Sequence, residues 1–123
     1  MTIHKKKNKA REHRIDMEAV VDAYGSEERA MGWYYYLEGK IEFPFKAKCL
    51  REKSILPLKK KEIVKVQSMA TEEDCQHDML VMVQWSGRKL AVPLSQLKGI
   101  SVSDETKEAI EDWHYWIAMG YEF

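Results

Sequence analysis

The chain has 123 residues, with 20 Lys and Arg, 20 Asp and Glu, and therefore no net charge at pH 7. This length and a hydrophobic content of 45% fit one small domain with an ordinary core. Its two cysteines, Cys49 and Cys75, exclude a disulfide framework, and the lack of a CxxC pair argues against structural zinc. No stretch is apolar for long enough to cross a bilayer, and the basic N-terminus lacks the apolar region of a signal peptide. We therefore expect a reducing, cytoplasmic location.

The balance of charge is uneven along the chain. Residues 1–14 carry six Lys and Arg against Glu12, so residues 15–123 have a net charge of −5. We predict a flexible basic arm over residues 1–14 and a single domain over residues 15–123. Short basic tails are most often disordered and solubilising, so the arm alone does not favour a nucleic-acid partner.

Two helices are expected before a β-rich middle and one after it. Apolar residues among Asp and Glu predict a short amphipathic helix from Ile15 to Tyr24. A second helix is expected from a cap at Ser26 to a terminal glycine at Gly39. A third begins at Ser103, where a cap precedes two carboxylates and a stripe of apolar residues at helical spacing.

Four strand-like runs lie between the second and third helices, at residues 43–50, 62–69, 79–85 and 89–94. Pro44 suits an edge strand, and Ser86-Gly87 indicates a hairpin between the last two runs. The sequence therefore predicts an α+β fold. Its centre would be a small, strongly bent antiparallel sheet, an SH3-like barrel, flanked by the N-terminal and C-terminal helices.

An acidic loop separates the second and third strand-like runs. Glu72, Glu73, Asp74 and Asp78 place four carboxylates within seven residues that contain no Lys or Arg. Calcium takes six to eight hard oxygen ligands, so such a loop between two strands indicates a calcium site. The alternative is a solvated acidic turn that keeps the chain soluble.

Several unusual strings resemble a known family. They are residues 33–38 (WYYYLE), 43–49 (FPFKAKC), 54–58, 69–70, 90–97 (LAVPLSQL) and 109–116 (AIEDWHYW). Together they resemble the CcbP-like family of small calcium-binding proteins, first described from cyanobacteria, over residues 30–123. The resemblance implies a cytoplasmic protein that binds calcium through carboxylates outside any EF-hand. The chain indeed contains no EF-hand loop pattern.

Two departures from that family bear on affinity. The family pattern has an Asp after Leu37-Glu38, where this chain has Gly39, and its members are strongly acidic where this chain is neutral. Calcium affinity follows ligand charge and ligand number, so both differences predict a weaker site.

We predict that the ion lies between Glu38, the acidic loop and the last helix. Asp74, Asp78 and Asp112 are the leading ligands. The complete predicted set of calcium ligands is Glu38, Glu73, Asp74, Asp78, Glu108 and Asp112.

Other functions are weighed against calcium binding. Cys75 and His77 in the acidic loop are a soft pair that could take zinc, although two ligands make a weak site. If Trp33, Trp85 and the three tyrosines at 34–36 are exposed, the domain could instead be an SH3-like interaction module for a peptide or nucleic acid. No nucleophile–base pair, phosphate loop or HExxH motif supports catalysis. We therefore predict a non-catalytic calcium buffer or sensor.

Overall fold

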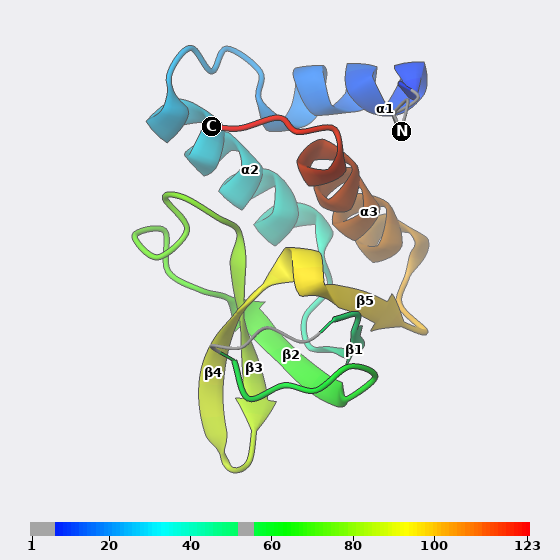
Figure 1. Ribbon diagram of the computed structural model, residues 1–123. Helices are drawn as coiled ribbons and strands as arrows, with labels where there is room; N and C mark the ends of the chain where they lie inside the picture. The colour runs from blue at the N-terminus through cyan, green and yellow to red at the C-terminus, as the bar shows by residue number, and fades with distance from the viewer. Residues whose placement is uncertain (1–6, 52–55) are drawn as a thin grey trace, which may run out of the picture.

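The computed structural model describes residues 7–51 and 56–123, and has an α+β fold with a helical layer above a curved sheet (Figure 1). The helices are α1 (Lys9–Arg14), the π-helical turn η1 (Ile15–Ala19), α2 (Ser26–Lys40), the 3-10 turn η2 (Leu94–Gln96) and α3 (Asp104–Ala118). The strands are β1 (Phe45–Cys49), β2 (Ile63–Met69), β3 (Leu80–Trp85), β4 (Arg88–Pro93) and β5 (Leu97–Ile100). Across the described parts of the chain, no helix is long and apolar enough to span a membrane.

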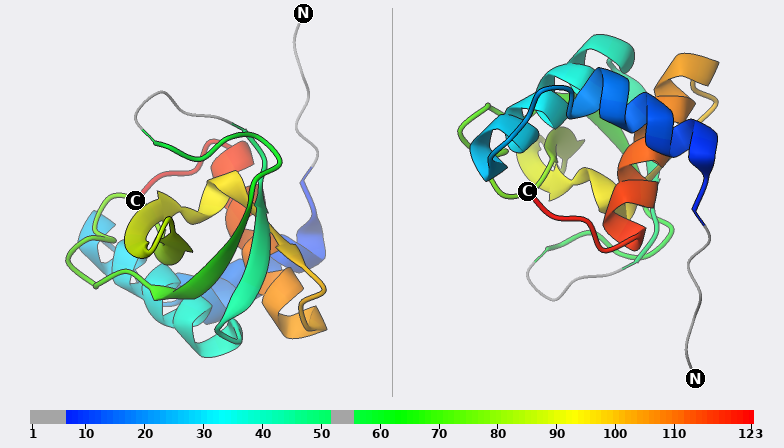
Figure 2. Two further views of the ribbon diagram at one scale, coloured as in Figure 1. Left: turned by 90° about the horizontal axis from the view of Figure 1, so that it is seen from below. Right: turned by 90° about the horizontal axis from the view of Figure 1, so that it is seen from above.

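The five strands form one sheet in the order β4-β3-β2-β1-β5, and every neighbouring pair is antiparallel. The sheet curls around its buried face without closing, because β4 and β5 are both edge strands (Figure 2). The predicted SH3-like barrel is therefore not confirmed. Pro44 precedes β1, which is an inner strand and not the edge strand that we expected.

The hairpin between β3 and β4 lies where the sequence predicts it. Ser86 and Gly87 have φ values of 50° and 76°, the left-handed conformation that tight two-residue hairpin loops require. Strand β5 was not predicted, because Leu97–Ile100 is only four residues long and contains a glycine.

The core lies between the helical layer and the inner face of the sheet. Trp33 of α2 and Trp113 of α3 are both buried, and their rings meet edge to face at 5.0 Å between centroids. Gly32 allows η1 to cross α2, because a Cβ at this position would collide with the carbonyl oxygen of Ala19. Helix α3 starts as predicted, with Ser103 Oγ accepting a 3.2 Å hydrogen bond from the backbone N–H of Thr106.

The N-terminal region differs from the prediction. We expected a flexible arm over residues 1–14, but Lys9–Arg14 form α1, which packs on α3. The backbone N–H of Asn8 donates to the Tyr115 hydroxyl at 3.1 Å, and that hydroxyl donates to Glu12 at 2.6 Å. The basic residues from Lys9 onward are thus part of the folded unit, while residues 1–6 lie outside the described part. The helix expected over Ile15–Tyr24 is only the short turn η1.

Candidate metal centre

The acidic loop between β2 and β3 is a compact turn built around Cys75. The Cys75 side chain is fully buried, its backbone N–H donates to the carbonyl of Thr71 at 3.1 Å, and its sulfur accepts from Leu80 N at 3.4 Å. With this side chain turned inward, Glu72, Glu73 and Asp74 are exposed. The loop therefore presents its carboxylates to solvent from a fixed base.

Two tyrosines connect helix α2 to this loop, which lies beside the helix in Figure 1. The buried Tyr34 hydroxyl donates to the carbonyl oxygen of Ala70 at 2.9 Å. The exposed Tyr35 hydroxyl donates to Glu72 Oε1 at 2.5 Å. Both contacts bring the carboxylate of Glu72 close to the C-terminal half of α2, where Glu38 lies.

Carboxylates of the loop and of α2 influence the ionisation of two buried side chains. Burial, together with the charges of Glu38 and Glu72, raises the pKa of Tyr34 to about 12. Burial also raises the pKa of the Cys75 thiol, with added contributions from Asp74 and Asp78. Because Cys75 itself acts on Tyr34, these four carboxylates act on one small region where the loop meets α2. We give the name acidic face to these carboxylates and their exposed neighbour Glu73, that is, Glu38, Glu72, Glu73, Asp74 and Asp78.

Asp112 is placed elsewhere, in a buried ionic network. Its side chain has no exposed surface, and its oxygens accept from Arg11 Nη1 at 2.8 Å, Arg14 Nε at 2.9 Å and Arg14 Nη2 at 2.7 Å. The Tyr36 hydroxyl adds a fourth hydrogen bond at 2.6 Å. The bond to Asp112 raises the pKa of Arg14, and burial followed by the same carboxylate raises that of Tyr36. Asp112 therefore has its negative charge compensated by two cations of α1.

Glu108 belongs to the same side of the molecule as Asp112. Lys40 Nζ lies 2.6 Å from Glu108 Oε1, and Arg14 Nε lies 3.4 Å from the same oxygen. This carboxylate is thus also held by cations, although it remains partly exposed.

The geometry of α2 explains why the predicted site is divided. Residues two apart on a helix point about 200° apart, so Tyr34 faces the acidic loop while Tyr36 faces Asp112. The structure places Glu38, Glu73, Asp74 and Asp78 on the acidic face, and Glu108 and Asp112 on the opposite side of α2. The predicted convergence of the loop with the last helix is corrected accordingly.

Within residues 7–51 and 56–123, no three His, Cys, Asp or Glu side chains are already arranged to hold a metal ion. Glu72 was left out of the predicted ligands; the sequence shows its place in the acidic loop but not its contact with Tyr35 of α2. The soft pair is also separated, because the Cys75 sulfur is turned into the core while His77 is exposed. The tyrosine run is mostly buried, with only Tyr35 largely exposed at 54%, which counts against an aromatic interaction surface.

Comparison with known proteins identifies relatives of this chain. The family model of CcbP-type calcium binding matches residues 13–117. The crystal structure of Anabaena CcbP has a TM-score of 0.88 and 42% sequence identity, covering 99% of this chain and 100% of that one. A structure described as a calcium binding protein in the calcium-binding form has a TM-score of 0.87 and 41% identity, with the same coverage. No curated protein matches the chain.

The fold and these matches thus define a small α+β protein of a calcium-binding class rather than of a known enzyme family. The chain belongs to the CcbP family of calcium-binding proteins.

Proposed function

We infer that this protein binds calcium reversibly and that the acidic face holds the ion. The observation that supports the place is the contact of α2 with the acidic loop through the hydroxyls of Tyr34 and Tyr35, which brings the charges of Glu38 and Glu72 to act on the same side chain. The observation that supports the ion is family membership, which includes a similar structure in a calcium-binding form.

The donors on the acidic face fit the chemistry of calcium. Every charged donor there is a carboxylate, and calcium prefers oxygen ligands over the nitrogen and sulfur that transition metals select. The carboxylates of Glu72, Glu73 and Asp74 are exposed, so they can turn toward an ion without disturbing the core. Glu38 lies in the last turn of α2, where the helix dipole also attracts a cation. Backbone carbonyls and water would complete the six to eight ligands.

Glu108 and Asp112 are left out of this proposed ligand set. A calcium ion at Asp112 would have to displace two arginines from a fully buried carboxylate, and it would leave those cations only their longer contacts to Glu111 and Glu108. We assign Asp112 to the attachment of α1 instead.

The proposed role is a non-catalytic one in the cytoplasm, as a calcium buffer or sensor. With Gly39 in place of a carboxylate, we expect a dissociation constant of about 10⁻⁶ to 10⁻⁴ M. This weaker range fits a site that uses one short loop and one helix end.

Calorimetric titration of calcium into chelator-stripped protein at near-physiological salt tests the proposal, with magnesium as the matched control ion. We expect saturable heat with calcium and a much weaker response to magnesium, which dehydrates reluctantly and requires octahedral geometry. Absence of both heat and thermal stabilisation by calcium would contradict calcium binding by this chain.

A further inference from the structure

The outer face of the sheet carries a set of exposed lysines. Along β1, Phe45, Ala47 and Cys49 are buried in the core, so the alternating Lys46 and Lys48 point to solvent. The same alternation in the neighbouring strands exposes further lysines. We call this surface the lysine face, and it consists of Lys46, Lys48, Lys65, Lys89 and Lys98.

The strand register places these lysines directly opposite one another. Lys46 pairs with Lys65 of β2, and Lys48 pairs with Lys98 of β5. Side chains opposite each other on one face have Cβ atoms about 4.5–5.5 Å apart, and like charges there destabilise a sheet. Two such pairs next to each other concentrate positive charge over β2, β1 and β5.

The first row continues across the rest of the sheet. Gln84 of β3 pairs with Lys65 on one side and with Lys89 of β4 on the other. A single row of side chains therefore runs over four strands, from Lys46 to Lys89, with three lysines and one amide. At about 4.8 Å per strand, it is roughly 14 Å long.

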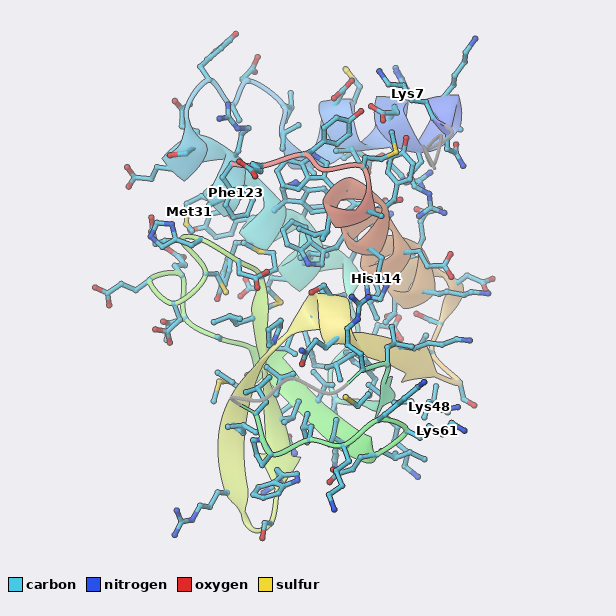
Figure 3. The ribbon with its side chains drawn as sticks, in the orientation of Figure 1. Lys7, Met31, Lys48, Lys61, His114 and Phe123 are labelled. Carbon is cyan, nitrogen blue, oxygen red and sulfur yellow. The ribbon has the colours of Figure 1, made fainter. Side chains whose placement is uncertain are left out.

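The positive charge of this face is largely uncompensated within the described residues. The ion pairs among the described residues use Arg11, Arg14 and Lys40, and none of them involves a member of the lysine face. In the same part of the chain, Glu42 is the only carboxylate that lines the cavity of about 480 Å³ shared by Lys46 and Lys65. Figure 3 shows Lys48 pointing away from the helices, beside Lys61 of the following loop, whose backbone N–H donates to Cys49 O at 2.8 Å.

We propose that the lysine face binds the phosphate backbone of double-stranded nucleic acid. Lysine ammonium groups are mobile point charges that suit phosphate contacts without reading bases. A duplex offers one negative charge per about 1.7 Å of its axis, so a row of this length meets several phosphates. This property is independent of the acidic face, and it is masked in the zero net charge of the chain.

A duplex fits this surface better than a single strand or a membrane. Among the described strand residues that share the outer face there is no Phe, Tyr or Trp, so the face lacks the stacking platforms that single-strand binders use. Ile63 is a large apolar side chain exposed on this face, with 59% of its surface accessible to solvent. The sheet also curls away at its edges (Figure 2), which limits its contact with a flat bilayer.

The test is fluorescence anisotropy of a labelled random-sequence DNA duplex with the full chain, in chelator, over a range of salt concentrations. We expect binding at low salt whose logarithmic salt slope is about −4.5 for five lysine contacts. The double variant Lys46→Gln, Lys65→Gln should reduce the magnitude of that slope by about 2 and weaken binding at least tenfold. Lys48→Gln with Lys98→Gln should have a similar effect.

The matched control is Lys7→Gln with Lys9→Gln, which removes equal charge from exposed positions at the start of α1. We expect it to keep nearly all of the affinity. An equal loss in this control, or no duplex binding at low salt, would overturn the proposal. Tighter binding to the unpaired strand, or to phosphatidylserine vesicles, would also overturn it in favour of those partners.

Folding and calcium binding are checked on the same variants. Removing both members of an opposed pair of like charges should leave thermal stability unchanged or slightly higher. Calcium titration should be unaffected, so failure of the duplex proposal and failure of calcium binding are separate results.

Discussion

Arg14 binds Asp112 through two nitrogens, with Nε 2.9 Å from Oδ2 and Nη2 2.7 Å from Oδ1. This paired contact joins α1 to α3 across 98 positions of sequence. Asp112 has no exposed surface and also accepts from Arg11 and Tyr36, so it is the buried ionic anchor of α1, beside the contacts of Glu12 with Tyr115 and Tyr121.

Asp112→Asn should destabilise the protein by about 3 kcal/mol, because it leaves two arginines facing a neutral amide. This loss of stability is at the lower end for breaking a buried ion pair, because both arginine side chains keep about a fifth of their surface exposed. Urea unfolding measures the change. Calcium affinity of the folded variant should stay within about twofold of the original, and a loss of calcium binding would return Asp112 to the ligand set.

Asp74→Asn combined with Asp78→Asn should lower calcium affinity by about tenfold or more without unfolding the domain, because affinity follows ligand charge. Calorimetric titration and thermal unfolding give the two readouts. The control is Asp16→Asn with Glu18→Gln, which removes the same charge from exposed positions of η1. Full affinity in the loop variant, or an equal loss in the control, would move the site away from the acidic loop.

The two predictions above separate Asp112 from Asp74 and Asp78, which the sequence analysis had placed in one calcium site. Helix periodicity correctly predicted where α3 begins and that Ala109, Ile110 and Trp113 are buried. Periodicity also places Asp112 on the polar part of the helix, and nothing local distinguishes a metal ligand from the partner of an arginine. That distinction depends on α1, which was itself expected to be flexible. Long-range pairing of this kind is invisible to a local pattern, as was the short strand β5.

Calcium binding should lower the pKa of Tyr35 and Tyr34. The hydrogen bond to Glu72 raises the pKa of Tyr35, and burial followed by Glu38 raises that of Tyr34 to about 12. A calcium ion on those carboxylates withdraws the acceptor and adds positive charge nearby, which favours the tyrosinate. Alkaline titration of tyrosinate absorbance, with and without calcium, measures the shift.

Tyr35→Phe isolates one hydroxyl in that titration. The calcium-dependent part assigned to Tyr35 should disappear in this variant, while the signals of Tyr115 and Tyr121, which donate to Glu12, stay the same. Identical titration curves with and without calcium would place the ion away from the tyrosine-bound carboxylates.

His114 should make the protein less stable as the pH falls. Its ring lies between α3 and η2 (Figure 3), with Nε2 3.2 Å from the carbonyl oxygen of Leu94, and burial lowers its pKa. The unfolded chain takes up a proton on this ring near pH 6.5, while the folded chain does so only at lower pH. The unfolded state therefore binds more protons over that interval, and stability present above about pH 6.5 is lost below it.

Urea unfolding above and below that pH, in the original chain and in His114→Gln, tests this point. The variant should lose less stability on acidification, whereas His77→Gln, at an exposed position, should behave like the original. Parallel pH profiles for all three proteins would show that other groups dominate the acid response.

Gly39→Asp should strengthen calcium binding by about tenfold, because it adds a carboxylate next to Glu38 at the end of α2. Gly39 faces open space, with no neighbouring atom within 4 Å of the position that a Cβ would take, so the new side chain can be accommodated without displacing neighbours. Gly39→Ala is the matched control: it should stabilise α2 by about 0.5–1 kcal/mol without changing calcium affinity. If both variants bind calcium like the original chain, then this helix end does not contribute to the site, and the ion is held by the loop alone.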